Sequence, residues 1–458
     1  MITIKNKQQL VENGEASLDR KARQLALTSL EKAVQSVDPK RIICSKLSFK
    51  NSVLKVNERS FELNRFKHVY VVGGGKASGS MAEGLEEILG QHVTDGLVNV
   101  PKTNKNKTKI IKLHAASHPM PDKKGVEGAC AMIDLAEQAD RDDLVICLIS
   151  GGGSSLMPLP RGDVSINDKK TMTDALLKSG ANINEINTVR KHISGFKGGW
   201  LAKKAYPATI LNLVLSDVVG DPLDFIASGP TVPDSTTFSD AVNVLNKYSL
   251  WDVTPVSIRQ VLTDGEKGKI PETPKLNDKA FKKVYNVVVG NNRSASSAAF
   301  AYLKASGVNA LLLTTALEGE ARTVGTVLAS IANEIAVSCN PVSRPAGIIA
   351  GGETTVVVTG KGLGGRNQEI PLSAALKLGR FEGIAVASLS TDGVDGPTDA
   401  AGAIVDGKTL EKAHKMGLEP EKYLANNDSY RFFSRLNDLV FTGPTGTNVN
   451  DVSVIVVV

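Results

Sequence analysis

The chain has 458 residues, of which 41% are hydrophobic and 22% charged, and its formal net charge is +6. The composition is that of an ordinary globular protein, and the length exceeds one typical core, so we expect two domains. No run approaches the roughly 20 apolar residues of a membrane span, and a mild charge with 5% aromatic residues argues against nucleic-acid binding.

The first seven residues lack the apolar stretch of a signal peptide, so we expect a cytoplasmic protein. The four cysteines are widely spaced, and no His/Cys cluster has the spacing of a zinc site. The lysines between positions 102 and 109 stand in a polar, Asn-rich stretch that is typical of a solvated loop. The excess of positive charge also suits small anionic substrates.

An apolar helical period over residues 17–37 predicts a helix before the first strand. Helical segments such as 80–89 and 294–304 then separate strand-like runs rich in Val, Ile and Leu, as expected of strands buried on both faces. These runs are residues 68–72, 144–149, 210–215, 284–290, 310–314, 347–350, 384–389 and 452–458. The alternation predicts an α/β fold: two α/β domains with mainly parallel sheets flanked by helices, and an active site in the cleft between the domains.

The stretch 264–279 is dominated by Gly, Pro, Glu and Lys and is the best candidate for a linker. It predicts an N-terminal α/β, Rossmann-like domain over 1–263 and a C-terminal α/β domain over 280–458. In open α/β sheets, ligands bind at the carboxyl ends of the strands. The turns that follow the predicted strands are therefore the places to look for a site.

The first such turn, residues 73–76, reads Gly-Gly-Gly-Lys. A Rossmann loop needs a third glycine where Ser78 stands, and a Walker loop needs Ser or Thr after its lysine, where Ala77 stands. Neither pattern fits, so we expect a phosphate-binding turn of another kind, with Lys76 facing a transferred phosphoryl group. A solvent-exposed lysine after a tight turn is the alternative.

A second turn, residues 150–155, reads Ser-Gly-Gly-Gly-Ser-Ser and offers backbone N–H groups and hydroxyls without charge. A third, residues 360–365, leads into Arg366. Glycines let backbone N–H groups close around an anion. The candidate nucleotide- and phosphate-binding residues of the first two turns are Gly73, Gly74, Gly75, Ser78, Ser150, Gly151, Gly152, Gly153 and Ser154.

Residues 184–205 place apolar side chains on one helical stripe, with Arg190, His192 and Lys197 off it. We expect Arg190 or Lys197 to contact an anionic substrate. Glycines within this segment cost helix propensity, which suggests close approach to a ligand or a helix. For His192 we expect a hydrogen-bonded surface position rather than a role as a base.

Carboxylates gather in two further turns, 216–221 and 391–399. Mg²⁺ is typically bound by one or two carboxylates together with substrate phosphates, so Asp217, Asp392 and Asp395 are candidate metal ligands. Asp217 is also a candidate catalytic residue. Because Asp, Gly and Pro build turns for structural reasons as well, any single aspartate can instead be structural.

Taken together, these motifs and several others resemble the class II glycerate kinases, from about residue 17 to the C-terminus. The motifs that carry the resemblance are residues 73–78, 118–122, 150–154, 187–192, 215–221, 228–231, 351–354, 364–369, 391–402 and 446–451. Ser155 is a departure, because a small apolar residue is expected there. It bears on the packing of the loop more than on chemistry.

The resemblance implies magnesium-dependent transfer of the γ-phosphoryl group of ATP to D-glycerate, usually giving 2-phosphoglycerate. It ties Lys76 and Arg366 to activity, and Asn367 beside Arg366 is a candidate substrate-binding residue. A planar Arg366 would clamp a carboxylate or a phosphate. The implied partners are D-glycerate and ATP, with no nucleic acid or membrane, and a homodimer is possible.

Two alternatives stay open. One is an NAD(P)-dependent hydroxypyruvate reductase, a label that relatives of this family have carried, but the 73–78 turn lacks the dinucleotide pattern that hydride transfer from such a cofactor needs. The other is a non-catalytic ligand-binding regulator of the same fold. Such a protein would be expected to lose Lys76, Arg366 or the acidic turns, and all of them are present.

Overall fold

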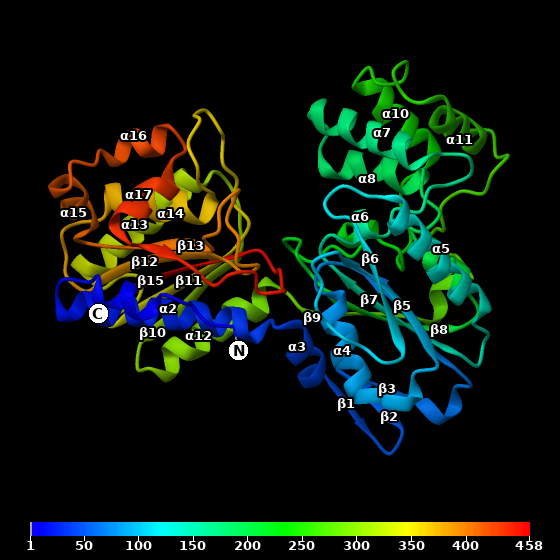
Figure 1. The fold of residues 1–458 in the computed structure, drawn as a ribbon, viewed down its shortest axis with the longest axis horizontal. Helices are drawn as coiled ribbons and strands as arrows, with labels where there is room; N and C mark the ends of the chain where they lie inside the picture. Colours follow the sequence, from blue (N-terminus) through cyan, green and yellow to red (C-terminus); the bar gives the residue numbers. More distant parts are fainter. Residues whose placement is uncertain (1) are drawn as a thin grey trace. The chain divides into compact units, whose positions relative to one another are not determined.

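The protein is described by a computed structural model of residues 2–458, which divides into two compact units (Figure 1). One unit is Pro39–Val289, and the other combines the chain up to Asp38 with Gly290–Val458. Each unit contains a six-stranded sheet covered by helices. This arrangement confirms the predicted α/β class with two domains.

The sheet of the 39–289 unit has the order β6-β5-β4-β7-β8-β9. Its strands are β4 (Val69–Gly74), β5 (Asp95–Pro101), β6 (Ile111–Ala116), β7 (Leu144–Ser150), β8 (Thr209–Leu215) and β9 (Val284–Gly290). Strand β4 pairs in parallel with β5 and β7, β5 with β6, and β7 with β8, as predicted. Every residue of β7 is buried, in keeping with its continuous apolar sequence.

The remaining elements of this unit include a small antiparallel sheet, β1 (Leu47–Lys50), β2 (Val53–Val56) and β3 (Arg59–Glu62). Its helices are α3 (Pro39–Lys46), α4 (Ser78–Leu89), α5 (Lys123–Gln138), α6 (Gly153–Leu156), α7 (Ile166–Lys178), α8 (Ile183–His192), α9 (Trp200–Ala205), α10 (Phe238–Lys247) and α11 (Val256–Glu266). Short 3₁₀ turns are η1 (Leu63–Arg65), η2 (Gly90–His92), η3 (Ile226–Ser228) and η4 (Lys279–Lys283). Helices α7, α8, α10 and α11 share a core of their own and form a helical group at one end of the unit (Figure 1).

The sheet of the other unit has the order β10-β11-β15-β12-β13-β14. Its strands are β10 (Asn309–Leu317), β11 (Ala346–Gly352), β12 (Ile384–Ser390), β13 (Gly402–Asp406), β14 (Leu439–Val440) and β15 (Asp451–Val457). Only the pair β10–β11 is parallel among the described pairs, because β15 lies between β11 and β12 and runs antiparallel to both. The expectation of a mainly parallel sheet is therefore wrong for this unit, where β12 also reaches β13 through a connection without a helix.

Helices cover both faces of this mixed sheet (Figure 1). They are α1 (Lys7–Glu12), α2 (Ser17–Ser36), α12 (Asn292–Ala305), α13 (Ala321–Ser338), α14 (Arg366–Lys377), α15 (Thr409–Lys415), α16 (Pro420–Ala425) and α17 (Ser429–Leu436). Helices α2 and α12 pack together on one face, and α13 and α14 pack together on the other. Because both faces are covered, β11, β12 and β15 are buried along their whole length.

The boundaries of the units differ from the predicted domains 1–263 and 280–458 and from the predicted linker 264–279. The N-terminal helix α2 was correctly placed in sequence, but it packs on α12, β12 and β15 and so belongs to the C-terminal unit. Within it, Arg23 is fully buried and pairs with Asp406 at 2.6 Å and Asp438 at 2.7 Å. Strand β9, which follows the predicted linker, completes the sheet of the other unit.

Candidate active site

The first two glycine turns lie side by side, because they follow the paired strands β4 and β7. The backbone N–H of Lys76 donates to the carbonyl of Gly151 at 2.8 Å, and the N–H of Ala77 donates to Oγ of Ser150 at 3.1 Å. The hydroxyl of Ser78 bonds Oγ of Ser150 and the carbonyl of Leu148, each at 3.0 Å. Ser78 and Ser150 are buried, so they join the turns to each other.

The glycines of the first turn are required by the close packing of β4. A Cβ atom on Gly73 would lie 2.2 Å from the carbonyl oxygen of Leu148, and one on Gly75 would lie 2.1 Å from Oγ of Ser150. Both glycines also have positive φ, +152° and +155°. The N–H of Gly75 donates to the carbonyl of Asn99 at 3.3 Å. The backbone N–H groups of residues 75–77 therefore donate to groups of the protein itself. In this turn, the group that would bind a ligand is the side chain of Lys76.

The second turn lies close to three polar side chains. A Cβ atom on Gly151 would lie 1.9 Å from Oδ2 of Asp217, and one on Gly152 would lie 2.7 Å from Nε2 of His118 and 3.3 Å from Cγ of Lys76. The absence of side chains in this turn thus lets Asp217, His118 and Lys76 approach the same stretch of backbone. Within residues 2–458, the Lys76 ammonium group has no hydrogen-bond or ion-pair partner.

His118 was not among the predicted site residues. It is partly buried, and burial, followed by the charge of Lys76, lowers the pKa of its imidazole. A lowered pKa keeps the ring neutral near pH 7, so that it does not compete with Lys76 for an anion. The sequence signal was the 118–122 motif, which contributed to the resemblance but carried no predicted role.

The start of α6 lies beside a strained segment. Three successive residues, Ala227, Ser228 and Gly229, have φ of +51°, +59° and +62°. This backbone places Oγ of Ser228 2.7 Å from Oγ of Ser154, and the same hydroxyl donates to Oδ1 of Asn187 at 3.1 Å. Non-glycine residues at positive φ cost energy and gather at functional sites. The first-turn N–H groups of α6 lack helical partners, so Gly153 and Ser154 offer donors there.

The expected helix over 184–205 is broken. Helix α8 ends at His192, and α9 begins at Trp200, because Gly198 and Gly199 adopt φ of +56° and +84°. His192 is fully buried and does not lie on the surface. In the interior its ring nitrogens form hydrogen bonds with the carbonyl of Thr188 at 2.7 Å and with Oε1 of Glu272 at 3.0 Å. The prediction of a hydrogen-bonded histidine is confirmed, and its surface position is wrong.

The break turns Lys197 inward. Its Nζ donates to the carbonyls of Ser154 at 2.9 Å and Met157 at 3.1 Å, and the side chain is 1% exposed. Lys197 and Arg190 line one cavity of about 330 Å³, together with Ser154. The two predicted substrate contacts of this unit therefore lie together, next to the second glycine turn.

In the other unit, Arg366 begins α14 between two acidic side chains. Its guanidinium donates hydrogen bonds to Oε1 of Glu353 at 2.7 Å and to Oδ1 of Asp451 at 3.2 Å, and its Nε forms an ion pair with Oδ2 of Asp451 at 2.5 Å. These carboxylates raise the pKa of the guanidinium, and burial raises the pKa of Asp451 to about 6. Two of the five N–H donors of Arg366 thus form hydrogen bonds within the described residues, which leaves other donors for a ligand.

The neighbouring predicted residues support this arginine. Asp395 is 2% exposed and accepts from the backbone N–H of Asn367 at 3.0 Å and from Nε2 of Gln368 at 2.9 Å, and burial raises its pKa to about 7. Asn367 is fully buried, and its Oδ1 accepts from Ser388 at 2.6 Å. These contacts fix the first turn of α14. Asp392 is more open and lines a cavity of about 590 Å³ with Arg366.

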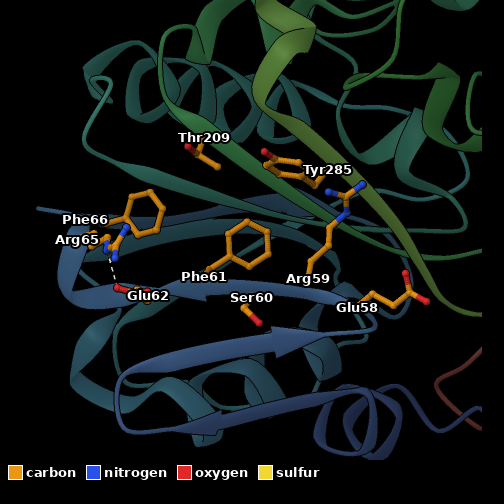
Figure 2. A pocket seen from close by; sticks show the side chains of 9 residues that line it. All are labelled: Glu58, Arg59, Ser60, Phe61, Glu62, Arg65, Phe66, Thr209 and Tyr285. Atoms are coloured by element: carbon orange, nitrogen blue, oxygen red, sulfur yellow. Dashed lines mark ion pairs between the residues drawn. The ribbon is translucent and has the colours of Figure 1, made fainter.

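A further cavity, of about 410 Å³, lies between β3 and β9 of the 39–289 unit (Figure 2). Figure 2 shows Phe61 and Tyr285 on its walls, and the guanidinium of Arg59 lies 4.5 Å from the centre of the Tyr285 ring. No predicted site residue lines this cavity. We therefore do not assign it to the candidate active site.

Two features that would indicate another type of site are absent from residues 2–458. No helix there combines the length and the hydrophobicity that crossing a membrane requires. No group of three or more His, Cys, Asp or Glu side chains there is arranged to hold a metal ion by itself. A site in which substrate oxygens complete the coordination needs fewer protein ligands than that.

Family models match two parts of the chain: a domain of unknown function over residues 25–263 and the MOFRL family over residues 346–451. A protein of Pyrococcus horikoshii named glycerate 2-kinase is 43% identical, over 95% of this chain and 97% of its own length. A putative hydroxypyruvate reductase of Agrobacterium vitis is 42% identical, over 84% of this chain and 98% of its own length.

A solved structure named glycerate kinase, from Thermotoga maritima, superposes with a TM-score of 0.85. It is 41% identical in sequence, and the match covers 95% of this chain and 99% of that one. Identity at this level over nearly the full length of both chains agrees with the motifs that carried the resemblance. The chain therefore belongs to the class II glycerate kinase family, with its MOFRL domain at the C-terminal end.

Proposed function

We propose that this chain is an ATP-dependent glycerate kinase that forms 2-phosphoglycerate and ADP from D-glycerate and ATP. The observation that carries the proposal is the second glycine turn, where Lys76 and Asp217 both approach backbone without side chains. A lysine with no protein partner and a carboxylate beside it supply what phosphoryl transfer needs, a positive charge and a proton acceptor. The 43% identity to a glycerate 2-kinase supports the same substrate.

In this reaction, the 2-hydroxyl oxygen of glycerate forms a bond to the γ-phosphorus as the bond to the bridging oxygen of ADP breaks. The hydroxyl proton passes to Asp217, and Lys76 compensates the negative charge on the transferred group. The N–H groups of Gly152, Gly153 and Ser154 would hold phosphate oxygens. Gly73, Gly74, Gly75, Ser78 and Ser150 would shape the turns around them.

Arg190 and Lys197 are proposed substrate contacts. Arg366 would bind an oxyanion through the N–H donors that Glu353 and Asp451 leave open. Asn367 and Asp395 would position Arg366 through the first turn of α14. The expected placement of the active site between the two domains stays a prediction, as do the cytoplasmic location and a homodimer.

A magnesium ion is expected with the nucleotide, and the residues fit one that uses few protein ligands. Asp392 lines an open cavity and Asp217 lies at the second glycine turn, whereas Asp395 already accepts hydrogen bonds on both oxygens. We propose Asp392, in the unit that contains Gly290–Val458, as a metal-facing carboxylate, and Asp217, in the 39–289 unit, as a separate candidate for that role besides proton acceptance. The ion would neutralise charge on the phosphate oxygens when bound.

The test is ADP release by the purified protein with ATP and Mg²⁺. We expect release that depends strictly on D-glycerate, and no oxidation of a reduced nicotinamide cofactor when hydroxypyruvate is supplied. Cofactor oxidation without ADP release would instead favour the reductase that the Agrobacterium vitis relative is named for. Release of ADP without D-glycerate would contradict the proposed acceptor.

A further inference from the structure

Three basic side chains converge on the cavity of about 330 Å³ that adjoins the second glycine turn. Lys169 comes from α7, Arg190 from α8, and Lys197 from the turn that follows α8. Pro119, Met120 and other apolar side chains also line the cavity. Lys169 had no predicted role, because a lysine in a helix with several charged residues is typical of a solvated face.

The hydrogen-bond partners of these groups are all neutral. Nζ of Lys169 donates to the carbonyl of Leu159 at 3.2 Å, and Nζ of Lys197 donates to the carbonyls of Ser154 and Met157. The Arg190 guanidinium has no hydrogen-bond or ion-pair partner within residues 2–458. Lys169 is 7% exposed and Lys197 is 1% exposed, so water compensates little of their charge.

The other charged groups that line the cavity do not neutralise it. Lys170 on α7 adds a fourth basic side chain. Asp174, also on α7, is the one acidic side chain in the lining, but it is 61% exposed and pairs with Lys178 at 2.7 Å. The excess of basic groups is therefore a property of the cavity as a whole.

Arg23 provides an internal comparison. It is a fully buried basic side chain as well, yet it pairs with Asp406 and Asp438, and the pKa of its guanidinium is raised. In the cavity the effect is opposite: burial, followed by the charge of Arg190, lowers the pKa of Lys169 to about 7, and the same causes lower that of Lys197. Buried basic groups without an acidic partner lower the stability of the fold, and a bound anion would compensate their charge.

We propose that the cavity formed by Lys169, Arg190 and Lys197 is an oxyanion subsite, which holds a carboxylate or phosphate group of a substrate. The proposal deepens the proposed kinase function and rests on it for the identity of the substrate. Lys197 links the subsite to the phosphate-binding turn, because it donates to the carbonyl of Ser154. Two oxyanions of the reaction could occupy the subsite: the carboxylate of glycerate and a phosphate of the nucleotide.

The subsite makes anion binding depend on pH. An oxyanion binds the charged form of Lys169, so binding raises the pKa of that lysine and takes up a proton. The affinity for an anion should therefore be highest below the pKa of about 7 and fall as the pH rises to 8.5. Arg190 keeps its charge over this range and supplies the binding that remains.

The first experiment uses inorganic phosphate alone as the probe and thermal unfolding of the full chain as the readout. We expect phosphate to raise the Tm of the wild type more at pH 6 than at pH 8.5, with matched chloride as the reference. Lys169→Met should weaken phosphate binding about tenfold and remove most of its pH dependence. Lys282→Met, which removes an exposed lysine of the same unit, should leave both unchanged.

Equal stabilisation of the wild type and Lys169→Met by phosphate at both pH values would overturn the subsite. Arg190→Met and Arg190→Lys guard against a purely structural effect, since only Arg190→Lys should retain part of the binding. These measurements need no turnover. A wild type that binds phosphate in this way but releases no ADP would contradict the kinase function and leave the subsite intact.

Steady-state kinetics then identify the source of the anion. If the cavity holds the carboxylate of glycerate, Lys169→Met raises the KM for D-glycerate about tenfold and leaves the KM for ATP unchanged. If it holds a phosphate of the nucleotide, the KM for ATP rises instead. Unchanged KM values for both substrates would overturn a role of the subsite in the reaction.

Discussion

At the scale of single residues, Lys76 differs from the other basic groups around the second glycine turn. Lys197 is bound by two carbonyls, whereas the Lys76 ammonium group has no protein partner within residues 2–458. The positive charge and the N–H donors of Lys76 are therefore available to a ligand. The lowered pKa of His118 beside it keeps a second positive charge from competing for the same anion.

We predict that Lys76→Ala lowers turnover by about 10²–10³-fold, because a fixed charge that faces the transferred group is lost. The Tm should stay within a degree or two of the wild type, since no hydrogen bond of the fold is removed. Steady-state rates and thermal unfolding check both parts. Near-normal turnover, or a rate loss accompanied by a large fall in Tm, would contradict the assigned role.

Asp395 yields a prediction on stability. Burial raises its folded-state pKa to about 7, above its value in the unfolded chain, so this group stabilises the fold at low pH and that contribution is lost as the pH rises towards 7. Asp395→Asn cannot ionise, so its unfolding free energy should fall less between pH 4 and 7. Urea unfolding across this range measures the difference, and parallel pH profiles for the two proteins would refute it.

The sequence could predict some of these residues and not others. Lys76 and Arg366 stand at the ends of glycine turns, which marked them as candidates. His118 and Lys169 reach their places through tertiary packing of a loop and of α7, and no local pattern signals that. The burial of Asn367 likewise depends on its contacts with Asp395 and Ser388, which lie far from it in the chain.

At the scale of elements, the candidate site depends on how closely the two glycine turns and the turn after β8 approach each other. Gly151 lies against the carboxylate of Asp217, and Gly152 lies against His118. Any side chain at position 151 would displace Asp217. The turn therefore sets the position of the carboxylate, and activity should be sensitive to a single added methyl group.

We predict that Gly151→Ala lowers turnover by about tenfold or more, because its Cβ atom would lie 1.9 Å from Oδ2 of Asp217. Combining it with Asp217→Ala relieves the clash, so the double variant should regain stability without regaining activity. A thermal unfolding series of both single variants and the double variant, together with their rates, tests this. Full activity in Gly151→Ala would show that Asp217 need not occupy this position.

Strands β4, β7 to β12 and β15 and helices α2, α4 and α12 could be predicted from apolar runs and helical periodicity, within a few residues of the observed bounds. The segment 184–205 could not, because Phe196 and Trp200 continue the apolar stripe of α8 while Gly198 and Gly199 break the backbone. The sequence also did not indicate in which direction β15 runs. A buried strand has the same apolar pattern in a parallel and in an antiparallel pair.

At the scale of the whole molecule, the N-terminal residues complete the C-terminal unit. The apolar face of α2 packs on β12, β15 and α12, and Arg23 bridges two carboxylates of that unit. Composition suggested a linker at 264–279, but composition does not reveal that β9 returns to the first sheet. Long-range pairing of this kind is set by contacts between distant residues.

This division predicts how fragments behave. A fragment of residues 39–289 should unfold cooperatively, because it keeps its complete six-stranded sheet. A fragment of residues 1–263 lacks β9 and the two carboxylates that pair with Arg23. In it, either Arg23 stays buried without a partner or α2 is exposed to solvent, and the free energy of unfolding falls by several kcal/mol. Urea unfolding and size-exclusion chromatography compare them. Equal stability of the two fragments would contradict the observed boundaries.

The central claim is that this chain transfers a phosphoryl group from ATP to the 2-hydroxyl of D-glycerate. Phosphorus NMR of the reaction mixture tests it most directly, because it reports both the transfer and the position of the new ester. We predict that the resonances of ATP give way to those of ADP and to a phosphomonoester coupled to one carbon-bound proton. Inorganic phosphate as the sole product, or a phosphomonoester coupled to two such protons, would contradict the claim.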